Sequence, residues 1–530
     1  MRKPSLGRRA FAGLAALAAF AALLSGCTAG GAKEEKGASG PSGVYYEIFV
    51  RSFADSNGDG IGDLNGVTEK LDYVKSLGAD GIWLMPIQPS PSYHGYDVTD
   101  YYGINKEYGT EDDLKRLLAE AHKRGIKVIM DLVVNHSSSE HPWFVDAASS
   151  PDSAHRDWYI WSSSRGGDTP GDGAAGQPPW HASGGDNYLG IFWEGMPDLN
   201  FDNPAVRQEI TKVGQYWLKM GFDGFRLDAA KHIYGDFNST VNTPAVKEKN
   251  RAWWQEFRRG LNEVNPKAYL VGEVWDGTAV IGPYLKDAFD SAFNFDLAAK
   301  LLGAADSERA TDVGFTLSRV YDFYAKSSDG KFVDALFLSN HDQNRVMSAV
   351  GGNVDHAKTA AAMLLTLPGN AFVYYGEELG MSGLKPDERI REPFPWNRAP
   401  GQAGETTWEA SHNRGDGSVS VEQEESDKDS LLSRYRTLIS WRKQDAALRK
   451  GTVGSYESGN DAVMAYARAA GEEKRLVLHN LSGKEQEVTI APPKGTDDKY
   501  AKLARTTDDA ASLSKGKLTL PPYATVVLKP

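Results

Sequence analysis

The sequence predicts an α/β fold: a (β/α)8 barrel interrupted by one inserted domain and followed by an antiparallel β-sandwich. From residue 44, short apolar runs rich in β-branched and aromatic residues alternate with amphipathic helical patterns, which is typical of a parallel sheet. Residues 137–200 interrupt this alternation, and after residue 446 short strand-like runs follow one another directly. A chain of 530 residues is long enough for one barrel with insertions and one small further domain.

The predicted barrel strands come in a regular order along the chain. Between the second and third strands, residues 111–125 carry leucines and alanines at helical spacing and end in glycine, which predicts an amphipathic helix. The two parts of the barrel are expected at 44–136 and 201–445. The strand-like runs lie at 44–53, 81–86, 126–135, 221–228, 268–275, 289–295, 335–342 and 370–376.

Residues 137–200 are rich in Pro, Gly, Ser, Trp and His, and they include DTPGDGAAGQPPW at 168–180. A loop of that length without structure of its own is uncommon in a compact domain, so a small domain is expected to be inserted after the third strand.

From 446 to 530, apolar and polar residues alternate at short spacing. This alternation predicts the antiparallel β-sandwich.

The first 26 residues have the pattern of a targeting segment. A basic start, MRKPSLGRR, precedes an apolar run too short to span a bilayer, and LSGC closes the segment at 24–27. The pattern resembles a bacterial lipoprotein signal, with Cys27 as the lipidated first residue of the mature protein. An ordinary secretory signal with a chance cysteine is the alternative. Arg8 and Arg9 leave open whether export follows the general or the twin-arginine route.

Residues 27–43 are small, polar and glycine-rich, as in a flexible tether. Lipidation implies an exported protein on the outer face of the bacterial cell membrane, attached to that membrane through the lipid anchor alone. Cys27 is the only cysteine, so the mature chain is expected to fold without a disulfide.

The charge of the chain excludes one class of partner. The net charge is −12, the pI is about 5.5, and no basic cluster follows the first ten residues. These values argue against nucleic acid as a partner. We expect a monomer.

Three carboxylates end three of the strand-like runs. In GFDGFRLDAAKH at 221–232, Arg226 and Asp228 lie two residues apart and therefore on one face of a strand, where the guanidinium would keep Asp228 ionised. A structural ion pair would have the same spacing. Glu273 lies among apolar residues that would raise its pKa towards that of a general acid, and Asp342 ends the run at 335–342.

In a (β/α)8 barrel the catalytic residues lie at the carboxyl ends of different strands, so these three acids should converge on one pocket. Two carboxylates suffice for glycoside hydrolysis, one as a nucleophile and a protonated one as an acid. The third can bind sugar hydroxyls or stabilise the developing positive charge.

The chain resembles the α-amylase family of retaining glycoside hydrolases from about residue 44 to the C-terminus. The resemblance implies a TIM barrel with a domain B inserted after strand 3. It also implies that Asp228 is the nucleophile, Glu273 the general acid/base and Asp342 the transition-state stabiliser. The ordered motifs are DLVVNH at 131–136, MPDLN at 196–200, GFRLDAAKH at 224–232, GEVW at 272–275 and LSNHD at 338–342.

The resemblance also implies which residues bind sugar, with Arg226 as the partner of the nucleophile and Tyr96 as a stacking platform. Zinc is an alternative for the histidines, but none of them lies in an HExxH or similar spacing. The remaining implied contacts are His94, His136 and His341 around the sugar at subsite −1, and Lys231 and His232 on the acceptor side.

Calcium is the expected cofactor, at one or two sites. DSNGDGIGD at 55–63 offers Asp55, Asn57, Asp59 and Asp63, although Gly66 stands where an EF-hand requires Glu. An Asp/Gly turn without metal is the alternative. The family's ion between barrel and domain B corresponds to Asn135 and Asp198.

The expected function is α-amylase activity, the retaining endo-hydrolysis of α-1,4 bonds in starch, maltodextrins and related α-glucans. The alternative is an oligo-1,6-glucosidase, α-glucosidase or neopullulanase-like activity. The strand-1 loop and Arg345 favour this glucosidase side, whereas AAKH at 229–232 favours the amylase. A non-catalytic starch-binding role is the third possibility, but all three acids are present, which argues against it.

Overall fold

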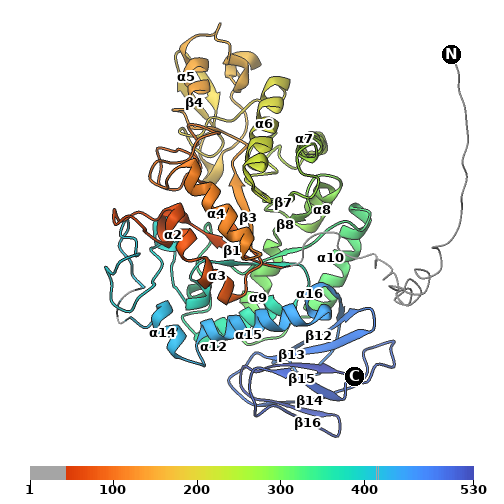
Figure 1. The fold of residues 1–530 in the computed structure, drawn as a ribbon. Helices are drawn as coiled ribbons and strands as arrows, with labels where there is room; N and C mark the ends of the chain where they lie inside the picture. The colour runs from red at the N-terminus through yellow and green to blue at the C-terminus, as the bar shows by residue number, and fades with distance from the viewer. Residues whose placement is uncertain (1–42, 414, 416) are drawn as a thin grey trace, which may run out of the picture. The chain divides into compact units, whose positions relative to one another are not determined.

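A parallel sheet of eight strands forms the centre of the computed structural model, which describes residues 43–530 except 414 and 416 (Figure 1). The predicted signal, Cys27 and all of the tether but Gly43 lie outside the described residues. In chain order the strands are β1 (Val44–Ile48), β2 (Gly81–Leu84), β3 (Lys127–Leu132), β6 (Gly224–Leu227), β7 (Tyr269–Gly272), β8 (Ser291–Ala292), β9 (Ala335–Leu336) and β10 (Asn370–Tyr374).

The sheet closes into a barrel. Its strand order is β8-β7-β6-β3-β2-β1-β10-β9, and each neighbouring pair is parallel. An isolated parallel bridge between Phe293 and Ala335 joins the two ends of this order, β8 and β9. The predicted (β/α)8 barrel is therefore confirmed.

Helices connect the strands and surround the barrel (Figure 1). The predicted helix at 111–125 is α4 (Glu111–Lys123), which begins with a capping box between Thr110 and Asp113 and is followed by Gly125 with a φ of 71°. The other helices outside domain B are α1 (Val50–Phe53), α2 (Leu64–Glu69), α3 (Leu71–Leu77), α6 (Pro204–Met220), α7 (Pro244–Asn262), α8 (Thr278–Ile281), η4 (Gly282–Leu285), α9 (Phe295–Ser307), α10 (Val313–Ser327), α11 (Val346–Ala349), α12 (Val354–Thr366), η5 (Glu377–Leu379), α13 (Asp387–Ile390), α14 (Val421–Ser426), α15 (Leu431–Gln444) and α16 (Ala446–Lys450).

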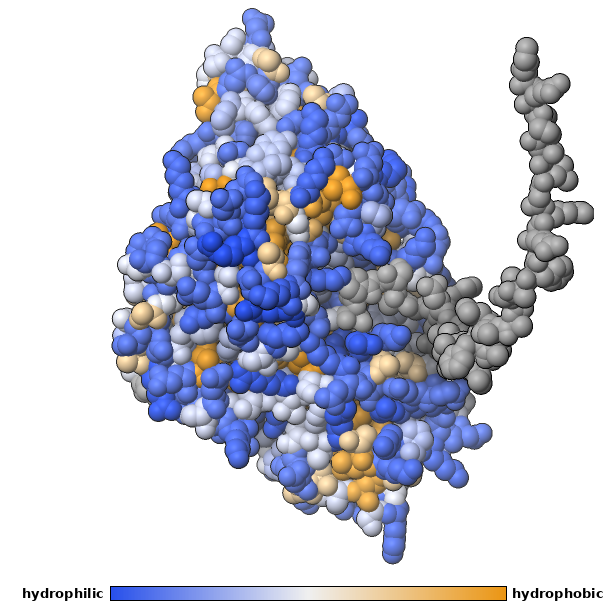
Figure 2. Space-filling view, in the orientation of Figure 1, coloured by the Kyte–Doolittle hydropathy of each residue, from blue (hydrophilic) through white to orange (hydrophobic). Residues whose placement is uncertain are grey.

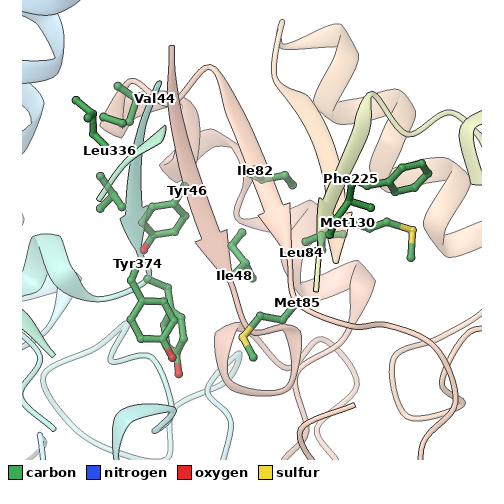
Figure 3. Close-up of a cluster of buried hydrophobic side chains, with 14 of the residues drawn as sticks. Val44, Tyr46, Ile48, Ile82, Leu84, Met85, Met130, Phe225, Leu336 and Tyr374 are labelled. Atoms are coloured by element: carbon green, nitrogen blue, oxygen red, sulfur yellow. The ribbon is translucent and has the colours of Figure 1, made fainter. Parts of the chain in front are cut away.

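Alternate residues of the strands belong to two separate hydrophobic cores. Tyr45 and Trp83 belong to a cluster drawn from barrel strands on several sides, which fills the interior. Their neighbours Tyr46 and Ile82 belong to the large cluster between strands and helices, part of which is drawn in Figure 3. The period of two in a strand therefore separates the barrel interior from the layer beneath the helices.

Several strands are shorter than the sequence predicts. The first was expected to run to residue 53, but β1 ends at Ile48 and residues 50–53 form α1. Phe53 packs against Phe394 and Trp396, so its apolar character reflects burial outside the sheet. Similarly, β8 and β9 have two residues each, within predicted runs of seven and eight residues.

Domain B lies between β3 and α6 in the chain. Phe144 packs against Tyr159, Trp161 and Tyr188, which gives the domain an aromatic centre of its own. Its elements are α5 (Pro142–Ser149), η1 (Arg156–Trp158), η2 (Ser162–Arg165), η3 (Ala174–Gly176) and the antiparallel pair β4 (Trp180–Ser183) and β5 (Asp186–Leu189).

The C-terminal domain consists of two antiparallel sheets, ordered β11-β12-β13-β18-β15 and β14-β17-β16. One hydrophobic cluster contains side chains from both sheets, which confirms the predicted β-sandwich. Residues 446–450 form α16, and the first strand of the domain begins at Thr452. The strands are β11 (Thr452–Ser455), β12 (Val463–Ala470), β13 (Glu473–Asn480), β14 (Gln486–Thr489), β15 (Lys502–Thr506), β16 (Ser512–Ser514), β17 (Lys517–Leu520) and β18 (Thr525–Lys529).

The face of the molecule seen in Figure 2 is mostly hydrophilic, with small separate hydrophobic patches. Within the described part of the chain, no helix combines the length and the apolar character needed to cross a membrane.

Candidate active site

The inward face of the barrel changes from aromatic to charged at the carboxyl ends of the strands. Tyr45, in the interior cluster, is followed two residues later by Glu47 on β1. Val271, in the same cluster, is likewise followed by Glu273 just after β7. Because alternate residues of a strand share a face, these carboxylates point into the barrel at the carboxyl ends of its strands.

Arg226 holds three carboxylates together at this end of the barrel. Its guanidinium is buried and donates hydrogen bonds to Asp228 at 2.7 Å, to Glu273 at 2.7 Å and to Asp131 at 2.8 Å. Two different terminal nitrogens, Nη1 and Nη2, contact Asp228 and Glu273. The predicted nucleophile and the predicted acid/base are thus fixed on one rigid group.

Burial and charge act in opposite directions on these carboxyls. Burial raises the pKa of Asp228 to about 6, even though Arg226 favours its ionised form. The pKa of Asp228 therefore lies higher than an Asp–Arg pair alone implies, although Asp228 is still mostly ionised at pH 7. Burial also raises the pKa of Glu273, as expected for a general acid.

Glu273 is oriented by a strained turn as well as by Arg226. Its Oε2 accepts a hydrogen bond from the backbone N–H of Ala229 at 3.0 Å. Ala229 directly follows Asp228 and has a φ of 46°, a left-handed conformation that is uncommon outside glycine. The turn after β6 therefore positions both carboxylates.

A second network surrounds Asp342. His341 lies between Glu47, at 2.6 Å from Nδ1, and Asp342, at 3.0 Å from Nε2. Burial alone would lower the pKa of His341, but Asp342 and Glu47 raise it to about 9, so the ring is positively charged at neutral pH. Arg391 contacts Asp342 at 3.0 Å. Although burial favours the neutral acid, His341 and Arg391 hold the pKa of Asp342 well below its usual range.

The three acids face one cavity of about 800 Å³. Arg226 and His341 lie beneath its floor, buried, and Tyr96 stacks on His341 with ring centroids 5.5 Å apart. Of the residues predicted to act or to bind sugar, those that line the cavity are His94, Tyr96, His136, Asp228, Lys231, His232, Glu273 and Asp342.

The rim of the cavity near Lys231 and His232 is aromatic. His232 stacks on Phe237, with ring centroids 4.9 Å apart and an interplanar angle of 8°. Trp275 is 49% exposed, stacks on Phe295 at 4.4 Å and accepts a hydrogen bond from Lys231 through its backbone carbonyl. An exposed flat ring such as that of Trp275 offers a surface on which a sugar ring can stack.

Three charged residues that hold the catalytic groups in place were not predicted from the sequence. Asp131 bridges Arg226 and the Tyr96 hydroxyl, Glu47 pairs with His341, and Arg391 pairs with Asp342. The sequence does hold a signal for Glu47 and Asp131, since each is a single charged residue within an apolar strand. A charge buried in this way requires a partner, which marks both as members of a charged site. Arg391 lies in a loop after β10 and had no such signal.

The residues predicted to bind calcium lie in two places. Asn135 donates to Asp198 at 3.2 Å, and both are buried at the junction of β3 and domain B. In the loop 55–63, Asp55 and Asp63 accept several backbone N–H bonds, so their carboxylates point into the loop. Among the described residues, no group of three or more His, Cys, Asp or Glu side chains is arranged to hold a metal.

Comparison with known proteins agrees with the geometry of this site. A family model described as the α-amylase catalytic domain matches residues 47–451, and a model of the C-terminal domain of the α-amylase SusG matches residues 463–527. The chain belongs to the α-amylase family of glycoside hydrolases.

Particular relatives cover nearly the whole chain. Alpha-amylase 3 of Dictyoglomus thermophilum is 42% identical over 92% of this chain and 93% of its own. An oligo-1,6-glucosidase of Bacillus cereus is 31% identical over 92% of this chain and 98% of its own. A crystal structure of an α-amylase from H. orenii has a TM-score of 0.84 at 44% identity and covers 92% of this chain and 99% of that one.

Proposed function

We propose that the protein is an α-amylase that cleaves α-1,4 bonds within starch and maltodextrins with retention of anomeric configuration. The observation that carries the proposal is the shared contact of Asp228 and Glu273 with Arg226, at 2.7 Å each, on the floor of a cavity of about 800 Å³. A retaining glycosidase requires its two carboxyls close together, with no room for water between them.

In the first step, the Asp228 carboxylate attacks the anomeric carbon while protonated Glu273 donates its proton to the departing glycosidic oxygen. Glu273 Oε2 already accepts bonds from Arg226 and Ala229, so the proton resides on Oε1. In the second step, Glu273 takes a proton from water, and the water oxygen replaces Asp228 at the anomeric carbon. Asp342 stays ionised between His341 and Arg391 and stabilises the positive charge that develops in both transition states.

Cleavage within chains is supported by the aromatic rim. Phe237 and Trp275 lie on the side of Lys231 and His232, beyond the catalytic carboxyls, and can hold further sugar units.

The second candidate is an oligo-1,6-glucosidase, favoured by the loop 55–63 and by the similarity to the Bacillus cereus enzyme. Chromatography of early products from amylose tests the choice. A spread of oligosaccharides supports the amylase, whereas glucose alone, with faster attack on isomaltose, supports the glucosidase.

For calcium, the pair Asn135 and Asp198 offers the better site. Burial raises the pKa of Asp198, and no cationic side chain pairs with it in the described part of the chain. A carboxylate and an amide oxygen are the hard ligands that calcium prefers, and the ion would supply the missing positive charge. At the loop 55–63, the carboxylates of Asp55 and Asp63 already accept several backbone N–H bonds, which leaves fewer oxygen lone pairs for an ion.

Lipid attachment through Cys27 is supported by the basic start, the apolar run and the LSGC sequence. It implies that the enzyme acts on α-glucan outside the cell while attached to the membrane. Radioactive palmitate supplied to expressing cells should label the protein, and Cys27→Ser should abolish the label. Equal labelling of both proteins would exclude Cys27 as the modified residue.

A further inference from the structure

A second hollow, of about 450 Å³, lies in domain B. Its wall is formed by the segment from Thr169 to Trp180 together with Asn187 on β5. This volume is within the range of small-molecule sites. The catalytic residues do not line it, and the proposed mechanism does not use it.

Trp180 has the features of a ligand platform and not those of a core residue. It is partly exposed and belongs to none of the hydrophobic clusters of the described chain. Its indole Nε1 donates to the Pro170 carbonyl at 2.8 Å, so the ring is held in one orientation. A fixed, partly exposed indole loses little entropy when a flat sugar face stacks on it.

Polar groups surround this ring. Asp172, Gln177 and Asn187 line the hollow, with Pro178 and Pro179 as apolar neighbours. Each of the three polar side chains also has a partner within the protein, which fixes its orientation. One aromatic face with several hydrogen-bonding groups matches a sugar, which has apolar C–H faces and a rim of hydroxyls. The charged groups near the ring are of opposite sign, Asp172 in the lining and Arg165 at 5.8 Å from the Trp180 ring centroid, so the lining does not favour a strongly charged ligand.

Residues that line this hollow contact residues that line the catalytic cavity. Gln177 donates to the Phe192 carbonyl at 2.6 Å, and Asp172 accepts from the Asn238 amide at 2.7 Å. Phe192 and Asn238 both line the catalytic cavity. The linings of the two hollows are therefore in direct contact, on the side of the catalytic cavity where Lys231 and His232 lie.

We infer that the Trp180 hollow binds a distal part of an α-glucan chain, so that long substrates contact the enzyme at two places. The inference rests on the proposed function, because it takes the substrate class from it. A second contact on one polymer raises the overall affinity without changing the chemistry at the cleaved bond. Short substrates that fill only the catalytic cavity gain nothing from it.

The test uses the full chain carrying Asp228→Asn, so that bound glucan is not cleaved. Affinity electrophoresis in gels containing amylopectin should show about tenfold weaker binding for Trp180→Ala, the loss expected for one aromatic contact. Maltotriose binding should be unchanged by this substitution. Trp158→Ala, a partly buried tryptophan of domain B that lines neither hollow, is the control and should retain amylopectin binding.

Trp180→Phe distinguishes two possible causes of lost binding: loss of the aromatic face, and loss of the indole hydrogen bond that holds the loop at Pro170. Phenylalanine keeps an aromatic face but cannot donate to Pro170, so binding should stay within about threefold of the parent if stacking is the cause. A loss as large as that of Trp180→Ala overturns the inference, and so does unchanged amylopectin binding in Trp180→Ala. If the enzyme with Asp228 intact neither binds nor cleaves α-glucan, the proposed function itself fails, which is a different result.

Discussion

Glu47 and His341 form a buried ion pair, 2.6 Å between Oε1 and Nδ1, that joins β1 to the loop after β9 beneath the catalytic cavity. Neither residue touches the cavity, yet His341 also contacts Asp342. The pair therefore links the stability of the barrel to the position of a catalytic acid.

Replacement of Glu47 by Gln should destabilise the protein by about 1.5–3 kcal/mol, because the buried imidazolium of His341 loses one of its two carboxylate partners and keeps only Asp342. Urea denaturation measures the free energy of unfolding. Glu107→Gln is the matched control, because Glu107 also forms an ion pair, with Arg51, but is 44% exposed; this substitution should cost less than about 1 kcal/mol. Equal losses for the two variants would contradict a special role for the buried pair.

The raised pKa of His341 predicts how stability depends on pH. The folded pKa, about 9, exceeds the value of about 6.5 in an unfolded chain, so the folded state binds the proton more tightly. The contribution of His341 is complete below about pH 6.5 and is lost as the pH rises through 9. Thermal melting between pH 6.5 and 9.5 should show a decline that is smaller in His341→Gln. Parallel curves for both proteins would argue against the assignment.

The loss of activity at low pH, the acid limb of the pH profile, should follow the protonation of Asp228. With a pKa of about 6 in the free enzyme, kcat/KM should fall as the pH drops below about 6, because the protonated carboxyl cannot attack. Asp131 raises the pKa of Asp228, so Asp131→Asn should move the limb to lower pH. A limb that stays in place, or moves to higher pH, would contradict this reading of the site.

Glu273→Gln should affect substrates according to their leaving groups. Hydrolysis of starch needs protonation of the departing sugar and should fall by about 10²–10⁴-fold, whereas activated aryl glycosides should lose much less in the first step. Rates on both substrates, with NMR of the first-formed anomer, provide the measurement. Equal losses on both, or release of the β-anomer first, would refute the roles proposed for Asp228 and Glu273.

Removal of calcium should lower thermal stability, because an ion that binds only the folded state stabilises it by mass action. The effect of a chelator should largely disappear in Asp198→Ala if the ion lies at the junction of β3 and domain B, and persist in Asp55→Ala. The reverse pattern would place the ion in the loop 55–63. An unchanged melting temperature in excess chelator would contradict both sites.

Alternation and motif order allowed much of the fold to be predicted from the sequence. The strand period of two placed Arg226 and Asp228 on one face, and the structure places them 2.7 Å apart. The alternation of the C-terminal strands likewise predicted the sandwich. The extent of each strand was less predictable, because apolar residues such as Phe53 are buried by later loops and not by the sheet.

The supporting residues of the site were also beyond the reach of sequence reasoning. Glu47 and His341 are 294 positions apart, and only closure of the barrel brings them together. Arg391 lies on a loop whose path depends on packing against β10 and α1. The raised pKa of Asp228 could not be predicted either, because desolvation at the floor of the cavity depends on burial, which a two-residue spacing does not reveal.

The barrel is closed between β8 and β9 by one bridge, Phe293 to Ala335, and each of these strands has two residues. A ring held by so few backbone bonds at one place opens there first, so amide exchange should be fastest along this seam. Glu273 follows β7 on one side of the seam and Asp342 follows β9 on the other. Transient opening of the barrel between β8 and β9 would therefore move Glu273, the proton donor, away from Asp342, the charge stabiliser. Asp228 and Arg226 lie on the same strand and its end, away from this seam, and would stay together.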